Sequence, residues 1–300
     1  MILESILTGA VRGGTSILYP VLGEITAERS GVINLGTEGS MIAGALGAYA
    51  VGIATGNPWM GALAGIVGGA LLAAVFAFIV IRRGANQLAT GLVVSLLGIG
   101  LTALFGQDYV GVGVVAFDVV PIPVLSDLPF VGRILFTHDP LTYLSGFAAP
   151  GLWWLLFRTE TGLRIRTAGE RPEVLDVFGV SAARVRFQAV VFGGALAGLG
   201  GAQLATAFAR NWSENMTVGR GYVAVALVIF AGWHPVRAVP AVYLFSGAVA
   251  LQLQLQARGI EVSRYLLEAS PYLVVLVALA VFSRRQLAHG PEALARVFDT

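Results

Sequence analysis

The chain has no cysteine and no lysine, and its 19 basic residues are all arginines. Without cysteine it cannot form disulfides, thiolate metal sites or a cysteine nucleophile. Without lysine it cannot carry a Walker A loop, which needs a lysine after its glycines, or a lysine Schiff base. ATP hydrolysis by that route is excluded, so any ATP-driven work of this chain depends on another polypeptide.

Charge is scarce too. Charged residues make up 12% of the chain and hydrophobic residues 56%, against roughly 25% charged in soluble domains. No charged side chain lies between Glu38 and Arg82, and Gly56-Asn57-Pro58 is the one break in that run. A membrane span needs roughly 20 apolar residues, so this run predicts two spans joined by a tight turn. The net charge of +2 gives no indication of nucleic-acid binding.

The same pattern recurs and predicts an all-α polytopic membrane protein, one domain over residues 1–300 with about nine transmembrane helices. Gly221–Val236 is short for a crossing and is expected to be a partial or broken helix. Small residues four apart, as at Gly194 and Gly198, predict close helix packing. The uncharged stretches are Gly39–Ile81, Gly84–Gln107, Leu141–Phe157, Phe187–Ala209, Gly221–Val236, Ala238–Ala257 and Ala269–Ser283, after an apolar segment at about Ile6–Gly23 that contains Arg12.

Arginine placement predicts the orientation, because cytoplasmic loops carry an excess of arginine. The rule puts Arg82, the arginine-rich loop 159–184 and Arg284 in the cytoplasm. The C-terminus is then cytoplasmic and, with nine spans, the N-terminus is external. Loop 108–140, rich in proline and aspartate, is external. The N-terminus has no basic region or cleavage site, so we expect the first span to stay in the membrane.

Two segments stand out by their residue types. In the cytoplasmic loop, Gly169 and Pro172 mark a turn into a new helix and Gly179 suits a helix cap; this favours a rigid projection toward a cytosolic partner, although a basic loop can equally serve topology alone. In the other, glycines around Asn34 break helical continuity where the chain re-enters the membrane. Broken helices often form transporter substrate sites, and the alternative is a helix cap with packing glycines.

Four stretches of the chain together indicate a family: Glu24–Gly39, Ala85–Gly91, Thr161–Arg186 and Trp212–Tyr222. They resemble the permease subunits of bacterial ABC importers in the branched-chain amino acid and ribose class. The stretch Glu24–Gly39 is similar to the signature of the simple-sugar and nucleoside branch. The resemblance runs from about residue 20 to Ser283, and Arg171 stands where the family more often has Asn.

The resemblance implies a type II ABC importer permease fold in which loop 159–184 is the coupling loop. It implies a non-enzymatic subunit that forms half of the pathway of an ATP-driven importer for nucleosides or related simple sugars. On this resemblance the subunit itself binds no cofactor and no metal, and a partner subunit uses the ATP. The implied partners are a cytosolic ATP-binding subunit, a second, related permease, an extracytoplasmic binding protein and the lipid of the bacterial plasma (inner) membrane. The residues do not identify the solute.

The residues expected to act fall into two groups. The substrate pathway is expected to include Asn34, Glu38, Asn86, Gln87, Trp212 and Asn215. Coupling to the ATPase is expected to involve Arg164, Arg166, Gly169, Glu170, Pro172 and Gly179. Helix capping explains Asn86 and Gln87 equally well, and an interfacial belt explains Trp212.

Two other classes of protein compete with this interpretation. An ion-coupled secondary transporter usually keeps ionisable groups deep in the bilayer, and the predicted middle spans contain none, with Arg12 the one deep candidate. An intramembrane enzyme would need clustered His, Asp or Glu, and the three histidines are scattered.

Overall fold

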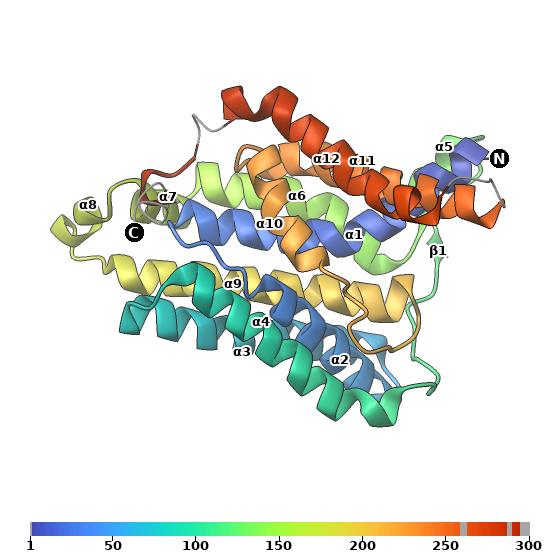
Figure 1. Ribbon diagram of the computed structural model, residues 1–300, viewed down its shortest axis with the longest axis horizontal. Helices are drawn as coiled ribbons and strands as arrows, with labels where there is room; N and C mark the ends of the chain where they lie inside the picture. The colour runs from blue at the N-terminus through green and yellow to red at the C-terminus, as the bar shows by residue number, and fades with distance from the viewer. Residues whose placement is uncertain (1, 259–262, 287–289, 295–300) are drawn as a thin grey trace.

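The computed structural model describes residues 2–258, 263–286 and 290–294. Its helices lie lengthwise in one bundle (Figure 1), so the predicted all-α class is confirmed. In these residues the one strand pairing joins β1 (Val120–Pro121) to β2 (Thr137–His138), both in the predicted external loop.

Long and short helices alternate along the chain. The long helices are α1 (Ile2–Arg29), α2 (Thr37–Thr55), α3 (Pro58–Ala77), α4 (Gln87–Gly106), α6 (Pro140–Arg158), α9 (Ala182–Gln203), α11 (Pro235–Ala257) and α12 (Arg264–Gln286). The shorter ones are α5 (Val131–Leu135), α7 (Glu160–Glu170), α8 (Pro172–Val177) and α10 (Arg220–Phe230), with η1 (Phe78–Arg82), η2 (Gln107–Tyr109) and η3 (Leu204–Phe208).

Four helical stretches of the described chain are long and apolar enough to cross a membrane: Pro58–Arg82, Gln87–Tyr109, Ala182–Phe208 and Pro235–Ala257. The number of about nine spans stays a prediction. Helix α10 has 11 residues, which span about 16 Å, roughly half of the hydrocarbon core. This agrees with the expectation of a partial helix in that stretch.

The predicted turn between the first two uncharged helices is confirmed. Gly56 takes a left-handed conformation (φ +67°) at the end of α2. The Asn57 side chain then accepts a hydrogen bond from the backbone N–H of Trp59 at 2.9 Å, with Pro58 in the first turn of α3.

Glycines hold α9 against α1, α2 and α3. A Cβ on Gly198 would collide with the backbone of Gly65 on α3, and one on Gly201 with the carbonyl oxygen of Met41 on α2. On the α1 side, Gly193 faces Gly23. The predicted small-residue packing is therefore present, and these four helices touch backbone to backbone.

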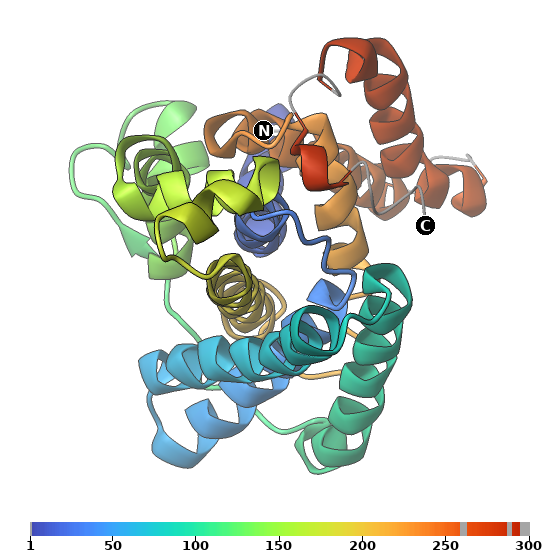
Figure 2. The ribbon, with the colours of Figure 1, turned by 90° about the vertical axis from the view of Figure 1, so that its left-hand side faces the viewer.

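The two ends of the bundle differ. The N-terminus and loop 108–140 lie at one end, and α7 and α8 at the other (Figure 1). Residues 290–294 reach the α7 end, where the Glu292 N–H donates to Glu170 at 3.3 Å. Seen from that end, α1 and α9 lie between α2–α4 on one side and α10–α12 on another (Figure 2).

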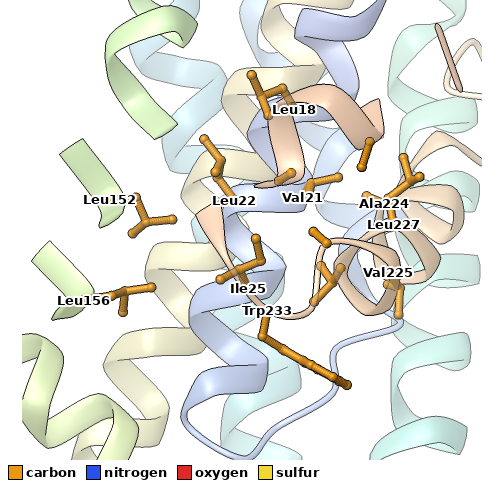
Figure 3. Close-up of a cluster of buried hydrophobic side chains, with 14 of the residues drawn as sticks. Leu18, Val21, Leu22, Ile25, Leu152, Leu156, Ala224, Val225, Leu227 and Trp233 are labelled. Atoms are coloured by element: carbon orange, nitrogen blue, oxygen red, sulfur yellow. The ribbon is translucent and has the colours of Figure 1, made fainter. Parts of the chain in front are cut away.

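A hydrophobic core joins α1 to α6 and α10. Leu22 and Ile25 of α1 are fully buried and lie between Leu156 of α6 and Leu227 of α10 in the cluster of Figure 3. Trp233, which follows α10, lies at the edge of the same cluster. This core fixes α10 beside the C-terminal half of α1, close to the irregular segment that follows α1.

Candidate functional site: a junction of two broken helices and a projecting loop

The chain leaves α1 and runs back into the bundle as an irregular, largely buried segment, residues 30–36, before α2 begins. Side chains take the N–H groups of this segment. The Asn34 N–H donates to Glu24 at 2.7 Å, the Gly36 N–H to the Asn34 side chain at 2.9 Å, and the Ile33 N–H to Gln87 at 2.9 Å. Buried irregular backbone is stable here because these groups are paired.

A second irregular segment, residues 209–219, leads to α10 and ends on the carboxylate of Glu38. That carboxylate accepts hydrogen bonds from the hydroxyl of Thr217 and the backbone N–H groups of Gly219 (2.9 Å) and Gly221 (2.6 Å). Glu38 itself lies in the first turn of α2. One negative charge therefore faces the amino ends of two helices, where the helix dipole favours it.

Arg220, the first residue of α10, anchors the same point to α1. Its guanidinium donates to the Ser16 hydroxyl at 2.9 Å and lies 5.4 Å from the centre of the Phe208 ring. The approach of α10 to α2 needs a residue without a side chain, since a Cβ on Gly221 would lie 2.5 Å from the Cα of Glu38. We call this meeting point of α1, α2 and α10 the junction; α2 and α10 both begin within the length of the bundle (Figure 1).

The six predicted pathway residues are not all in one place. Asn34 and Gln87 meet at segment 30–36, whereas Glu38 binds residues 217–221, and all three already have partners within the chain. Asn86 caps α4 by accepting from the Ala89 N–H at 3.0 Å. A contact of these side chains with solute stays a prediction.

The other two predicted pathway residues lie on segment 209–219. Trp212 is 2% exposed and its ring packs on Gly106 and near Tyr49, at a ring distance of 6.4 Å from the latter; it is an interior residue, not part of an interfacial belt. Asn215 is exposed and has a left-handed backbone (φ +54°).

Sequence reasoning missed two buried carboxylates on α1. Glu24 and Glu28 are each 2% exposed. Glu24 accepts from the Asn34 N–H and from the Thr37 hydroxyl at 2.9 Å, and Glu28 accepts from the indole N–H of Trp233. The signal was their spacing of four residues, which places both on one face of a helix.

At the other candidate site, α7 and α8 form the projecting loop. As predicted, Pro172 begins α8 and Gly179 (φ +70°) follows it in the left-handed conformation of a helix cap. Helix α8 lies at the tip of that end of the molecule (Figure 1). The side chains that sequence reasoning missed are Val177 and Phe178, which are 84% and 78% exposed. An apolar tip of this kind is typical of a protein-binding surface.

Helix α7 is fixed to the end of α1 and to segment 30–36. A Cβ on Gly169 would collide with the carbonyl oxygen of Arg29. Arg186 donates to the carbonyl oxygens of Ser30 (3.1 Å) and Ala168 (2.8 Å), joining α9, segment 30–36 and α7. Because segment 30–36 continues into α2, which begins at the junction, a continuous series of contacts joins the projecting loop to the junction.

The predicted coupling residues divide accordingly. Arg166 faces inward and donates to the Leu156 carbonyl at 3.0 Å. Gly169 also faces inward, packed against the backbone of Arg29. Arg164 and Glu170 are exposed on α7. Their part in coupling stays a prediction.

Broken helices that meet inside a membrane bundle are typical of transporters, and a multi-pass transport protein is the class that fold and junction define. Comparison with known proteins gives the family. Residues 5–282 match the model of the family described as branched-chain amino acid transport system / permease component, and the chain belongs to that family.

Curated relatives support this membership. The chain is 43% identical to a protein of Haloferax volcanii named as a glucose ABC transporter permease, TsgC13, over 84% of this chain and 78% of the relative. It is 30% identical to the guanosine ABC transporter permease NupQ of Bacillus subtilis, over 97% and 95% of the two chains. It is also 30% identical to the nucleoside ABC transporter permease NupC of Lactococcus lactis, over 95% and 94%. No solved structure matches the chain.

The predicted resemblance to ABC permeases is thereby confirmed, and the ion-coupled transporter is not supported. The chain is a transport subunit, not an enzyme, and as a permease component it is one part of a larger transport system.

Proposed function

We propose that this permease forms half of the translocation pathway of an ATP-driven importer for a nucleoside or a related simple sugar. The observation that carries the proposal is the near full-length relationship to permeases named for guanosine, nucleosides and glucose. A neutral polar solute also fits the junction. The carboxylate of Glu38 is already hydrogen-bonded by three groups of the chain itself, so it offers little to a cationic solute.

The proposed partners follow from the two ends of the bundle. A cytosolic ATP-binding subunit docks on α7 and α8, where Val177 and Phe178 are exposed. An extracytoplasmic binding protein delivers the solute at the opposite end. The second half of the pathway is a related but different permease. In support, Lactococcus lactis has, besides NupC, a second permease, NupB, that is 31% identical over 30% of this chain.

The proposed location is the bacterial plasma (inner) membrane, with α7, α8 and the C-terminus in the cytoplasm. Residues 290–294 support this, since they lie beside α7 at the end that the arginine pattern assigns to the cytoplasm. The C-terminal residues beyond 294 lie outside the described part of the chain.

The proposed mechanism uses the connection between loop and junction. ATP-driven closure of the partner moves α7 and α8. The movement passes from Gly169 to the end of α1, and through Arg186 to Ser30 and segment 30–36. The junction then opens to one side of the membrane or the other. The proposed coupling residues remain Arg164, Arg166, Gly169, Glu170, Pro172 and Gly179, and the proposed pathway residues Asn34, Glu38, Asn86, Gln87, Trp212 and Asn215.

The deciding experiment is reconstitution of the chain with the proteins encoded beside it. Uptake of labelled guanosine and glucose into proteoliposomes is measured with internal or external ATP, and with an imposed ion gradient alone. We expect uptake with ATP on the α7 side only, and none when the ATPase subunit carries an inactivating substitution. Uptake driven by the ion gradient without ATP would contradict the proposal, and uptake of neither solute would remove the substrate assignment alone.

Asn34 gives a local test of the pathway. Asn34→Leu removes the amide that accepts from Gly36, whereas Asn34→Asp keeps the acceptor. We expect Asn34→Leu to weaken uptake in a complex that still assembles, with Asn34→Asp closer to the wild type. Unchanged uptake kinetics in Asn34→Leu would take this residue out of the pathway.

A further inference from the structure

At the α7 end of the bundle a cavity of about 500 Å³ lies between α6, α7, residues 179–181 and the start of α9, and it reaches Thr26 of α1. Two arginines line it, Arg164 from α7 and Arg184 from α9, and both are exposed. The rest of the lining includes apolar side chains, among them Leu155 of α6, Ile165 of α7 and Phe192 of α9. The cavity is therefore cationic in one part and apolar in another.

The lining extends a long way along α9. It includes Ser181, which caps the helix, and Phe192, eleven residues further on. At 1.5 Å per residue this is about 16 Å, enough to pass from the membrane surface well into the hydrocarbon layer. Phe192 is 42% exposed, so the apolar part of the lining reaches the surface of the bundle.

The positive charge of the two arginines is not neutralised by a buried ion pair in the described part of the chain. Arg164 lies 3.7 Å from Glu160, but both side chains are more than half exposed, and such a pair contributes little. In the described part of the chain the guanidinium of Arg184 has no carboxylate within 4.0 Å. Guanidinium groups match the geometry of phosphate, and basic pockets beside membrane helices bind anionic lipid head groups.

We propose that this cavity binds an anionic phospholipid, with the phosphate between Arg164 and Arg184 and an acyl chain along Leu155, Ile165 and Phe192. A segment of a cytosolic protein fits less well, because the apolar lining continues along membrane helices to Phe192. The lipid contacts both α7 and α9, which flank the projecting loop, and so braces the loop against the bundle. The inference concerns lipid retention and does not depend on the solute.

The test uses the full chain in nanodiscs of equal parts phosphatidylglycerol and phosphatidylcholine, followed by native mass spectrometry of the lipid that stays bound. We expect selective retention of phosphatidylglycerol. The double variant Arg164→Gln, Arg184→Gln should lower it by about thirtyfold, as expected for two arginines near an anionic lipid. The matched control is Arg82→Gln with Arg83→Gln, which changes the charge equally at two exposed arginines outside the cavity.

A second variant leaves the charge unchanged. Gln188 is exposed and lines the cavity, so Gln188→Trp fills the space without disturbing the core. We expect it to lower phosphatidylglycerol retention while the melting temperature stays at the wild-type value. Equal retention in all variants, or no preference for phosphatidylglycerol, overturns the proposal.

Two further arms separate the alternatives. If inorganic phosphate displaces the bound lipid at millimolar concentration, the site is a phosphate site and the lipid assignment is wrong. If the ATP-binding partner displaces the lipid and protects Gln188→Cys from labelling, the cavity belongs to the partner interface, and the proposal is likewise wrong. If phosphatidylglycerol stays bound in the presence of phosphate and of the ATP-binding partner, the proposal is supported.

Discussion

The carboxylate of Glu38 accepts a hydrogen bond of 2.6 Å from the backbone N–H of Gly221, 183 residues further along the chain. Both residues are buried, and Glu38 is only 1% exposed. The contact ties the start of α2 to the start of α10. The two broken helices therefore begin at a common point, and we expect a shift of one helix start to displace the other.

Removal of this carboxylate should destabilise the protein strongly. Glu38→Ala leaves the N–H groups of Gly219 and Gly221 without their acceptor, which costs on the order of 3 kcal/mol. Glu38→Gln keeps an acceptor and should lie between Glu38→Ala and the wild type. Unfolding in mixed detergent measures the change, with exposed Glu214→Ala on the same segment as control; equal stability of Glu38→Ala and the control would contradict this reading of the junction.

The contact between α7 and α1 gives a test of coupling. In Gly169→Ala the added methyl meets the carbonyl oxygen of Arg29, and overpacking of this kind costs about 1–3 kcal/mol. We expect the variant to insert and assemble but to lose most ATP-coupled uptake. Gly151→Ala, at a glycine of α6 with open space around it, is the control. Wild-type uptake by Gly169→Ala would show that this contact does not carry the coupling.

Phe178 should matter for association and not for stability. Because its side chain is 78% exposed, Phe178→Ser should change the free energy of unfolding by less than about 0.5 kcal/mol. Loss of an aromatic anchor should weaken binding of the ATP-binding subunit by about tenfold or more. Pull-down and light scattering measure this, with Phe130→Ser on the opposite end as control. Full binding by Phe178→Ser would place the partner elsewhere.

Packing of α9 against α2 should tolerate no side chain at Gly201. Gly201→Ala collides with the Met41 carbonyl oxygen, which belongs to backbone and cannot rotate away. We expect loss of the folded protein on extraction. Gly100→Ala, with nothing within 4 Å, should leave the melting temperature unchanged or slightly raised. Equal melting temperatures of Gly201→Ala and Gly100→Ala would show that α9 does not need a glycine at this contact.

His138 predicts a dependence on acidity in the external loop. The ring is 1% exposed and bonds the Ile134 carbonyl at 2.7 Å, and burial lowers its pKa below the ordinary value. The folded state thus binds a proton less readily than the unfolded state. Its stability is complete above the ordinary pKa of about 6.5 and falls as the pH drops below that value.

The check is a melting curve at several pH values. His138→Gln, which cannot titrate, should lose less stability between pH 7 and pH 5 than the wild type does. The pKa of His234 is lowered in the same direction, by burial first, so the comparison is made between variant and wild type at each pH. Parallel curves would mean that His138 is not the titrating group.

Hydropathy predicted where most helices lie, and turn residues predicted the ends of α8, because both are local properties. The turn at Gly56-Asn57-Pro58 and the helix start at Pro172 depend on neighbouring residues alone. The depth at which α2 and α10 begin was not predictable in this way. It depends on Glu38 meeting Gly219 and Gly221, a contact between distant parts of the chain.

The buried carboxylates show the same limit. Glu24 directly follows Gly23, the last residue of the predicted first apolar segment, so from the sequence it is placed at the edge of a span and not in the interior. Its partners, the Asn34 N–H and the Thr37 hydroxyl, arrive because segment 30–36 folds back along α1. Phe178 was missed for the opposite reason, since an apolar residue on a short helix is normally expected inside.

The glycine contacts of α9 have a consequence for motion. Where Gly198 lies against Gly65, and Gly193 against Gly23, no flexible side chains lie between the backbones to absorb a shift. We therefore expect helices α1, α2, α3 and α9 to move together as one unit during a transport cycle. On this expectation, a hinge lies at the borders of this unit with α4, α6 and the three C-terminal helices.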